Sequence, residues 1–339
     1  MVQSLDEYLL SETTPLLSLD DLSLQFRGQA ANVVENVSLS VSTGEILCVV
    51  GESGCGKSVT AMALMGLLPL DTAQISSGKL AFDGQVIDLK SERISSDLRG
   101  GRMAMIFQEP MTSLNPAFRV GEQIAESVRR HRDCTRAAAR ERALEMLRRV
   151  GLPSPEQRLD QYPHQFSGGQ RQRVMIAMAL ANDPRLLIAD EPTTALDVTI
   201  QAQILDLIRD LQRETGMGTI MITHDLGVVA DIADTVAVMY GGQVVETGPV
   251  AEVFANPQHP YTIGLMASVP RLSGPRARLT TIEGTVPTLD KMPQGCRFRS
   301  RCPFASDLCA TRPALAKVGP NHSAACHFAP LEQTLRVAG

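Results

Sequence analysis

The sequence predicts an α/β fold with a largely parallel central sheet, followed by a small C-terminal appendage rich in proline and cysteine. Short apolar runs, of the length of buried strands, alternate with longer segments of helical periodicity. A glycine-rich phosphate-binding pattern lies between one such strand and the helix after it. Beyond about residue 258 this alternation stops, and prolines and cysteines become frequent.

The individual elements follow from these runs in chain order. We expect strands over residues 22–26, 37–41, 45–50, 103–107, 186–189, 219–223 and 236–239. We expect helices over residues 57–68, 120–150, 169–181 and 200–215. The first helix should stop before Pro69, because proline cannot continue a helix. Within the arginine-rich stretch 135–150, apolar residues recur at helical spacing, which leaves the arginines on a solvated face.

The composition is that of a globular protein with no general attraction to nucleic acid. The 339 residues are 44% hydrophobic and 20% charged, and the net charge is −5. This balance favours neither nucleic acid nor an anionic membrane surface. No apolar run approaches the ~20 residues of a membrane-spanning helix, and the acidic N-terminus lacks a signal-peptide pattern. We therefore expect a cytoplasmic protein that reaches a membrane only by docking onto other subunits.

Four of the seven cysteines lie in one short C-terminal stretch. They are Cys296, Cys302, Cys309 and Cys326, and His322 and His327 flank the last of them. In a chain with no export signal, such a cluster indicates metal binding rather than disulfides. Four thiolates can hold either Zn²⁺ or an iron–sulfur cluster. A metal would also explain how a proline-rich segment with a small core folds.

Residues 51–58, Gly-Glu-Ser-Gly-Cys-Gly-Lys-Ser, match the P-loop pattern G-x-x-x-x-G-K-[ST]. The pattern follows a predicted strand and opens a predicted helix, which is the context it requires. Its glycines let successive backbone N–H groups face phosphate oxygens, and the helix dipole favours the negative charge. Lys57 would reach the β- and γ-phosphates, and the Ser58 hydroxyl would bind Mg²⁺.

Four polar residues follow predicted strands and complete a phosphoryl-transfer site. Asp190 and Glu191 end the apolar run 186–189, where Asp190 suits Mg²⁺ and Glu191 suits a base for the attacking water. His224 and Gln108 each follow another predicted strand, at the end where α/β sheets bind ligands. Taken singly these residues are unremarkable, and their order after a P-loop gives them weight.

Residues 166–170, Phe-Ser-Gly-Gly-Gln, lie about twenty residues before the Asp-Glu pair. This ordered set resembles the ABC ATPase family over residues 16–250, with Phe166 where the family usually has leucine. The resemblance implies a RecA-like core with an ABC β-subdomain and a helical subdomain at about 111–180. We divide the chain into an N-terminal arm (1–15), a nucleotide-binding domain (16–265) and a C-terminal region (266–339).

The resemblance also implies a role for each matching residue. Glu191, His224 and Gln108 would be catalytic, and Ser58, Gln108 and Asp190 would hold Mg²⁺. The nucleotide contacts would be Phe26, Gly51, Ser53, Gly54, Cys55, Gly56, Lys57, Ser58, Val59, Ser167, Gly168, Gly169, Gln170 and Asp197. In this family ATP lies between the P-loop of one subunit and the signature motif, Ser167–Gln170, of another. One copy of each motif therefore implies pairing with a second ATPase subunit, which we expect to be a related chain.

Longer strings at 107–116, 162–170, 190–203 and 256–262 look like the oligopeptide/dipeptide-importer ATPases. The likeness extends to about residue 330 and implies a [4Fe–4S] cluster on the four cysteines, with zinc or free thiols as alternatives. It further implies two permease subunits, docked at residues 109–125, and an indirect link to an extracytoplasmic binding protein. The expected site is the cytoplasmic face of the inner membrane. Related importers for nickel or glutathione are the alternative function, and a soluble ABC ATPase acting on DNA or ribosomes is a remote one.

Overall fold

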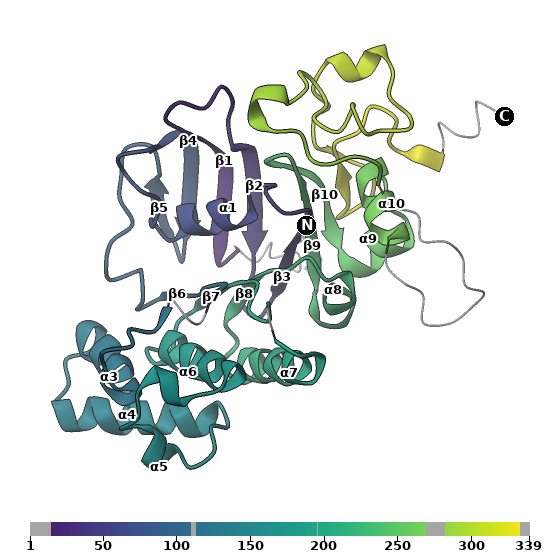
Figure 1. Ribbon diagram of the computed structural model, residues 1–339. Helices are drawn as coiled ribbons and strands as arrows, with labels where there is room; N and C mark the ends of the chain where they lie inside the picture. Colours follow the sequence, from purple (N-terminus) through teal and green to yellow (C-terminus); the bar gives the residue numbers. More distant parts are fainter. Residues whose placement is uncertain (1–14, 110–112, 195, 269–281, 333–339) are drawn as a thin grey trace, which may run out of the picture.

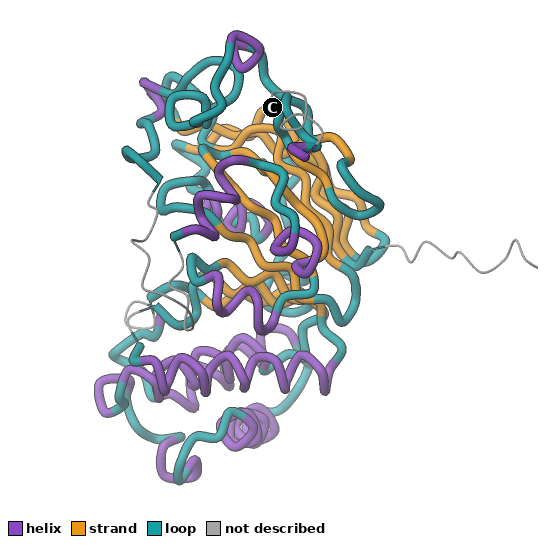
Figure 2. The backbone as a smooth tube through the Cα atoms, turned by 90° about the vertical axis from the view of Figure 1, so that its right-hand side faces the viewer, coloured by secondary structure: helices purple, strands orange, loops and turns teal. Residues whose placement is uncertain are grey.

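The computed structural model describes residues 15–109, 113–194, 196–268 and 282–332. Two sheets and a layer of helices make up the molecule (Figure 1). Seen from the side, the strands gather in the upper half and the long helices lie below them (Figure 2). Residues 1–14 of the predicted N-terminal arm and the arginine-rich segment 271–278 lie outside the described residues.

The central sheet has eight strands in the order β11-β12-β10-β9-β3-β8-β7-β6. Their bounds are β3 Ile46–Val50, β6 Met103–Ile106, β7 Leu186–Asp190, β8 Gly218–Ile222, β9 Thr235–Tyr240, β10 Gln243–Pro249, β11 Ala316–Lys317 and β12 Ser323–Ala324. The five strands from β9 to β6 run parallel. Every residue of β3, β6, β7 and β8 is buried, as expected for a parallel sheet covered on both faces. The predicted α/β fold is confirmed.

A second, antiparallel sheet covers one face of the first. Its order is β2-β1-β4-β5, with β1 Leu17–Phe26, β2 Val34–Val41, β4 Ala73–Phe82 and β5 Gln85–Asp88. Helix α1 (Lys57–Leu64) shares a buried core with this sheet and with Leu47 and Val49 of β3. The alternate residues of β3, Ile46, Cys48 and Val50, face the core on the opposite side. Because successive strand residues point to opposite faces, β3 anchors both layers.

The remaining helices cover the other face of the central sheet. Their bounds are α3 Val120–His131, α4 Arg136–Arg149, α5 Pro155–Arg158, α6 Gly168–Leu180, α7 Val198–Thr215, α8 Leu226–Ile232, α9 Val250–Ala255 and α10 Pro260–Ala267, with a 3₁₀ turn η2 at Pro163–Gln165. Helices α3, α4 and α6 pack on one another and form the lower layer of Figure 1. No helix in the described part of the chain combines the length and apolar character needed to cross a membrane.

Two predicted helices differ from those in the structure. The helix expected over 57–68 ends at Leu64, because Gly66 takes a left-handed φ of 62° and the Leu67 N–H donates to the Met62 carbonyl at 2.8 Å. This pairing is the Schellman pattern that closes helices. The helix expected over 120–150 is divided between α3 and α4. The chain extends at Arg132, and the Thr135 hydroxyl accepts from the Ala138 N–H at 3.2 Å to begin α4.

Residues 282–332 contain little regular structure. They hold two 3₁₀ turns, η3 (Leu289–Lys291) and η4 (Asp307–Ala310), and the short strands β11 and β12. Strand β12 pairs antiparallel with β10, so this C-terminal region continues the central sheet at its edge. Phe298 also packs edge-on against Tyr240 of β9, with ring centroids 5.0 Å apart. The region is therefore joined to the central sheet by both backbone and side chains.

Candidate nucleotide site

The P-loop, residues 51–58, connects β3 to α1. Gly51 and Gly56 have φ values of 150° and 95°, a region that favours glycine. A Cβ atom on Gly51 would overlap the carbonyl oxygen of Met239 on β9, so a larger residue does not fit there. Among the other residues predicted to contact nucleotide, Ser53 and Gly54 are exposed, Cys55 is buried, and Val59, in α1, is half-buried. The loop is thus held tightly against the sheet with its tip open to solvent.

The first turn of α1 carries the two side chains predicted to reach the phosphates and Mg²⁺. The Lys57 ammonium group donates to the carbonyl oxygens of Gly51 at 2.8 Å and Glu52 at 3.2 Å. The Ser58 hydroxyl donates to a carboxylate oxygen of Asp190 at 3.0 Å. Both side chains stand where the first N–H groups of the helix have no partner within it. This arrangement can bind a phosphate chain and a cation side by side.

Asp190 and Glu191 lie at the carboxyl edge of the parallel sheet, where β7 ends. Asp190 is 5% exposed. Burial raises the pKa of its carboxyl group, and the hydrogen bond from Ser58 partly opposes that shift. Glu191 has a φ of 46°, and its N–H donates to the Ile222 carbonyl at the end of β8 at 3.0 Å. A left-handed backbone conformation is uncommon for residues other than glycine, and such residues cluster at functional sites.

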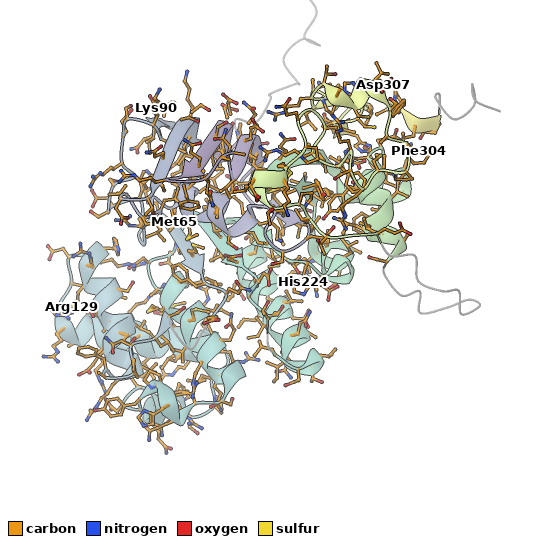
Figure 3. All side chains as sticks on the ribbon, turned by 45° about the horizontal axis from the view of Figure 1, so that its top comes forward. Met65, Lys90, Arg129, His224, Phe304 and Asp307 are labelled. Atoms are coloured by element: carbon orange, nitrogen blue, oxygen red, sulfur yellow. The ribbon has the colours of Figure 1, made fainter. Side chains whose placement is uncertain are left out.

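Three side chains converge on one carboxylate oxygen, Oε2, of Glu191. The Gln108 amide donates to it at 3.2 Å, the Thr194 hydroxyl donates at 2.8 Å, and His224 Nδ1 lies 3.4 Å away. Gln108 follows β6 and His224 follows β8, the strands on either side of β7. Figure 3 shows His224 near the middle of the molecule, close to where these strands end. The structure therefore brings together the three predicted catalytic residues and adds Thr194, which we had not predicted.

The signature residues Ser167–Gln170 begin α6, on the face of the central sheet opposite α1. The Ser167 hydroxyl accepts from the Gln170 N–H at 3.4 Å, and the Gln170 side chain accepts from the Ser167 N–H at 3.2 Å, which makes a capping box. Ser167 and Gly168 are exposed, whereas a Cβ atom on Gly169 would press on Ile200 of α7. Among the described residues, no hydrogen bond joins this motif to the P-loop. The motif faces solvent rather than its own nucleotide site.

Two further predicted contacts lie at element ends. Asp197 precedes α7, and its carboxylate accepts from the Ile200 N–H at 3.0 Å, so it caps that helix. Phe26 is the last residue of β1. The Val33 N–H donates to the Leu24 carbonyl near this strand end, and Val33 lies against the P-loop at Gly56. Phe26 is therefore carried on a strand whose end reaches the side of the P-loop.

A groove of about 650 Å³ lies between α3 and α4, and residues 118–125 of its lining belong to the stretch expected to meet a permease. Phe118 lines it and is 53% exposed, and Arg119, Glu122, Arg129 and Arg140 surround it. Large exposed aromatic side chains on a groove with a charged rim are typical of interaction surfaces. Figure 3 shows Arg129 on the helical layer, away from the C-terminal region marked by Phe304 and Asp307.

The four C-terminal cysteines gather in one part of the C-terminal region, and all have free thiols. The Cys296 N–H donates to the Cys309 carbonyl at 3.0 Å. Burial, and then the charges of the other three thiolates nearby, raises the pKa of Cys302 to about 11. Backbone N–H groups two residues ahead stabilise the thiolates of Cys296, Cys302 and Cys326. Across the described ranges, however, no three His, Cys, Asp or Glu side chains form a group that could hold a metal ion.

The two histidines beside Cys326 have other partners. His322 Nε2 lies 2.8 Å from a carboxylate oxygen of Glu246, which is completely buried in β10. His327 Nε2 lies 3.0 Å from the Thr311 carbonyl. Glu246 also accepts from the Gln258 N–H at 2.6 Å. His322 therefore helps to satisfy a buried carboxylate and ties the C-terminal region to the sheet.

The family ABC transporter matches residues 34–194, and the family of the oligopeptide/dipeptide transporter C-terminal region matches residues 245–309. A probable peptide ABC transporter ATP-binding protein of Sinorhizobium fredii is 53% identical, over 92% of this chain and 94% of its own. The dipeptide transport ATP-binding protein DppD of Escherichia coli is 47% identical, over 95% and 98%.

Solved structures agree with this assignment. The cassette cbiO1 of Clostridium perfringens has a TM-score of 0.60 at 29% identity, over 71% of this chain and 91% of its own. A dimeric ATP-binding cassette bound to ADP and phosphate, in a post-hydrolysis state, has a TM-score of 0.60 at 26% identity, over 69% and 98%. The chain belongs to the ATP-binding proteins of the ABC transporter family, in the group that carries the oligopeptide/dipeptide transporter C-terminal region.

Proposed function

We propose that this chain hydrolyses ATP to drive the import of dipeptides or oligopeptides, as one of two ATPase subunits on the cytoplasmic face of the inner membrane. The observation that carries the hydrolysis is the convergence of Gln108, Thr194 and His224 on Glu191, beside a P-loop. The peptide substrate is supported by the match of residues 245–309 and by relatives named as peptide or dipeptide transport proteins.

In this proposal each side chain has a role in the reaction. Lys57 would neutralise charge on the β- and γ-phosphates, and Ser58 and Asp190 would hold Mg²⁺ with Gln108 nearby. Two protein oxygens 3.0 Å apart fit this ion, because Mg²⁺ usually keeps several waters and substrate phosphates as ligands. Bound Mg²⁺ would stabilise the charge of the transferred phosphoryl group. Glu191 would orient the attacking water and accept its proton, and His224 would contact the γ-phosphate.

A second ATPase subunit would complete the site. Ser167 and Gly168 are exposed at the N-terminus of α6, where unpaired N–H groups favour an anion. They lie across the sheet from α1, so the motif is suited to the ATP of a partner. We propose a related chain as this partner, and two permease subunits docked at the groove beside Phe118. The contact with an extracytoplasmic binding protein would be indirect.

We also propose a [4Fe–4S] cluster on the four C-terminal cysteines. Their thiols are free and close enough for each thiolate charge to affect the others. A single Zn²⁺ would need four sulfurs at about 2.3 Å from one point, and the described residues do not form such an ion site. In an iron–sulfur cluster, the four thiolates bind different iron atoms and need not meet at one point.

Transport assays test the substrate. The chain is reconstituted in vesicles with its permeases and second ATPase, and the solute is delivered by the cognate binding protein. We expect dipeptides or oligopeptides to accumulate inside and to stimulate ATP hydrolysis. Uptake of nickel or glutathione, with no response to peptides, would overturn the peptide proposal and leave the ATPase assignment intact.

Metal analysis tests the cluster. We expect about four irons and four acid-labile sulfides per anaerobically purified chain, lost in Cys302→Ser and kept in Cys134→Ser, whose cysteine lies outside the C-terminal region. Stoichiometric zinc without sulfide, or an unchanged iron content in Cys302→Ser, would refute the cluster.

A further inference from the structure

A guanidinium group from the C-terminal region contacts the P-loop directly. One nitrogen of Arg301 lies 2.9 Å and 3.1 Å from the two carboxylate oxygens of Glu52, the second residue of the loop. The Arg301 side chain is only 5% exposed. The Glu52 side chain is 29% exposed, so the pair is partly shielded from water, and with two hydrogen bonds it is stronger than a fully exposed ion pair. The two residues are separated by 249 positions in the chain.

The rest of the Arg301 side chain is fixed by its surroundings. Its Nε donates to the Glu283 carbonyl at 2.9 Å, and another nitrogen donates to the Gly284 carbonyl at 3.1 Å. Its guanidinium carbon lies 5.8 Å from the ring centroid of Tyr240 on β9. These contacts hold the planar group in one orientation, which lowers the entropic cost of its bond to Glu52. Arg301 is therefore a rigid support rather than a mobile surface charge.

Glu52 is held by its main chain as well as by its carboxylate. Its N–H donates to the hydroxyl oxygen of Tyr261 at 2.8 Å. Tyr261 is completely buried in α10 and packs edge-on against Tyr240, with ring centroids 4.7 Å apart. Two residues, Arg301 and Tyr261, thus fix the start of the P-loop. Both of them lie outside the family's phosphate-binding pattern.

Glu52, which Arg301 and Tyr261 hold in place, also contacts the phosphate-binding lysine, Lys57. The Glu52 carbonyl accepts from the Lys57 ammonium group at 3.2 Å, and the neighbouring Gly51 carbonyl accepts from it at 2.8 Å. A change in the backbone orientation at Glu52 would move the carbonyl oxygens that orient the Lys57 ammonium group. Glu52 also places a negative charge on a loop that must bind a polyanion, and that charge repels phosphate unless a cation neutralises it.

We propose that Arg301 is a positioning residue for ATP binding: it neutralises Glu52 and fixes the start of the P-loop so that Lys57 can meet the phosphates. The inference rests on ATP binding at the P-loop, and it is independent of the transported solute and of any metal on the cysteines. It gives the C-terminal region a direct part in the nucleotide site.

The test compares Arg301→Ala, Arg301→Lys and the double variant Glu52→Gln/Arg301→Ala in the assembled transporter. We expect Arg301→Ala to raise KM for MgATP about tenfold with kcat within about twofold, because an unpaired carboxylate weakens binding in ground and transition states alike. Arg301→Lys keeps the charge and should recover part of the affinity. The double variant removes the negative charge of Glu52 and should also recover part of the affinity. Arg299→Ala is the matched control, because Arg299 is exposed and donates to the Gln294 carbonyl instead.

A fluorescent ATP analogue, titrated into the purified chain, gives Kd separately from turnover, and thermal unfolding shows whether each variant folds. An unchanged KM and Kd in folded Arg301→Ala would overturn the proposal. The proposal would also be overturned if the double variant lost as much affinity as Arg301→Ala. A merely structural role of Arg301 would not depend on the charge of Glu52. If hydrolysis were absent in every variant and in the parent chain, the ATPase assignment itself would fail.

Discussion

The side-chain amide of Gln108 donates to the carboxylate of Glu191 at 3.2 Å, although the two residues are 83 positions apart in the chain. Gln108 lies two residues after the end of the edge strand β6, and Glu191 directly follows the neighbouring strand β7. The hydrogen bond therefore joins the start of the connection between β6 and α3 to the proposed catalytic carboxylate. Because Thr194 contacts the same oxygen, two hydrogen bonds hold the Glu191 carboxylate in one orientation.

Replacing this carboxylate should separate binding from turnover. Glu191→Gln keeps the size of the side chain and can still form hydrogen bonds, but its amide cannot accept a proton, so we expect MgATP affinity within about twofold and turnover reduced at least about 100-fold. Phosphate release by the assembled transporter and nucleotide titration measure the two quantities. Glu141→Gln, on the exposed face of α4, is the control. Normal hydrolysis by Glu191→Gln would show that another group activates the water.

The exposed signature motif predicts a defect that appears only in the paired state. Gly168→Asp has room for its side chain, since the nearest atom to a Cβ there is Leu196 Cδ2 at 3.7 Å. It leaves the Ser167 cap intact and places a negative charge where a partner's ATP phosphates would lie. We expect the isolated chain to bind ATP normally and ATP-driven dimerisation to disappear, as followed by sedimentation in the Glu191→Gln background. Dimerisation at the parental ATP concentration would contradict the proposed pairing.

The buried carboxyl group of Asp190 predicts a pH-dependent stability. Its pKa is raised by burial, so the folded chain is destabilised as pH rises through the range where Asp190 ionises. Asp190→Asn removes that penalty, and without nucleotide we expect its unfolding temperature at pH 7 to exceed the parent's by roughly 2–4 °C. Near pH 3 the difference should vanish, because the unfolded-state pKa of aspartate is about 3.9. Asp71→Asn, at an exposed position, is the control.

The same substitution should abolish the tight binding of Mg²⁺ with ATP, because it removes the charged ligand that Ser58 contacts. An equal gain in unfolding temperature at both pH values would show that the ionisation of Asp190 is not the cause of the gain.

The local patterns in the sequence predicted the centre of the site well. The P-loop needs particular backbone angles at Gly51 and Gly56, so its residue pattern and its structure imply each other. The apolar runs before Asp190 and His224 marked buried parallel strands, whose carboxyl ends necessarily meet at one edge. These features depend on residues that are neighbours in the chain.

Contacts between distant segments were not predictable in this way. Nothing near Glu52 distinguishes it from any variable P-loop position, and Arg301 is one of several arginines in the C-terminal region. Strands β11 and β12 have only two residues each, too few for an alternating pattern to show. Thr194 follows Glu191 closely, yet its role appears only when a left-handed φ at Glu191 turns the chain back on itself.

The pairing of β12 with β10 has a consequence for how the chain can be divided. Glu246 and Thr247 of β10 pair with Ala324 and Ser323 of β12, across the boundary that the sequence suggests near residue 265. A chain cut there would present β10 as an open sheet edge, a template for uncontrolled association. Residues 16–265 and the C-terminal region therefore share one sheet, and an exchange of cassettes between transporters would have to carry both together.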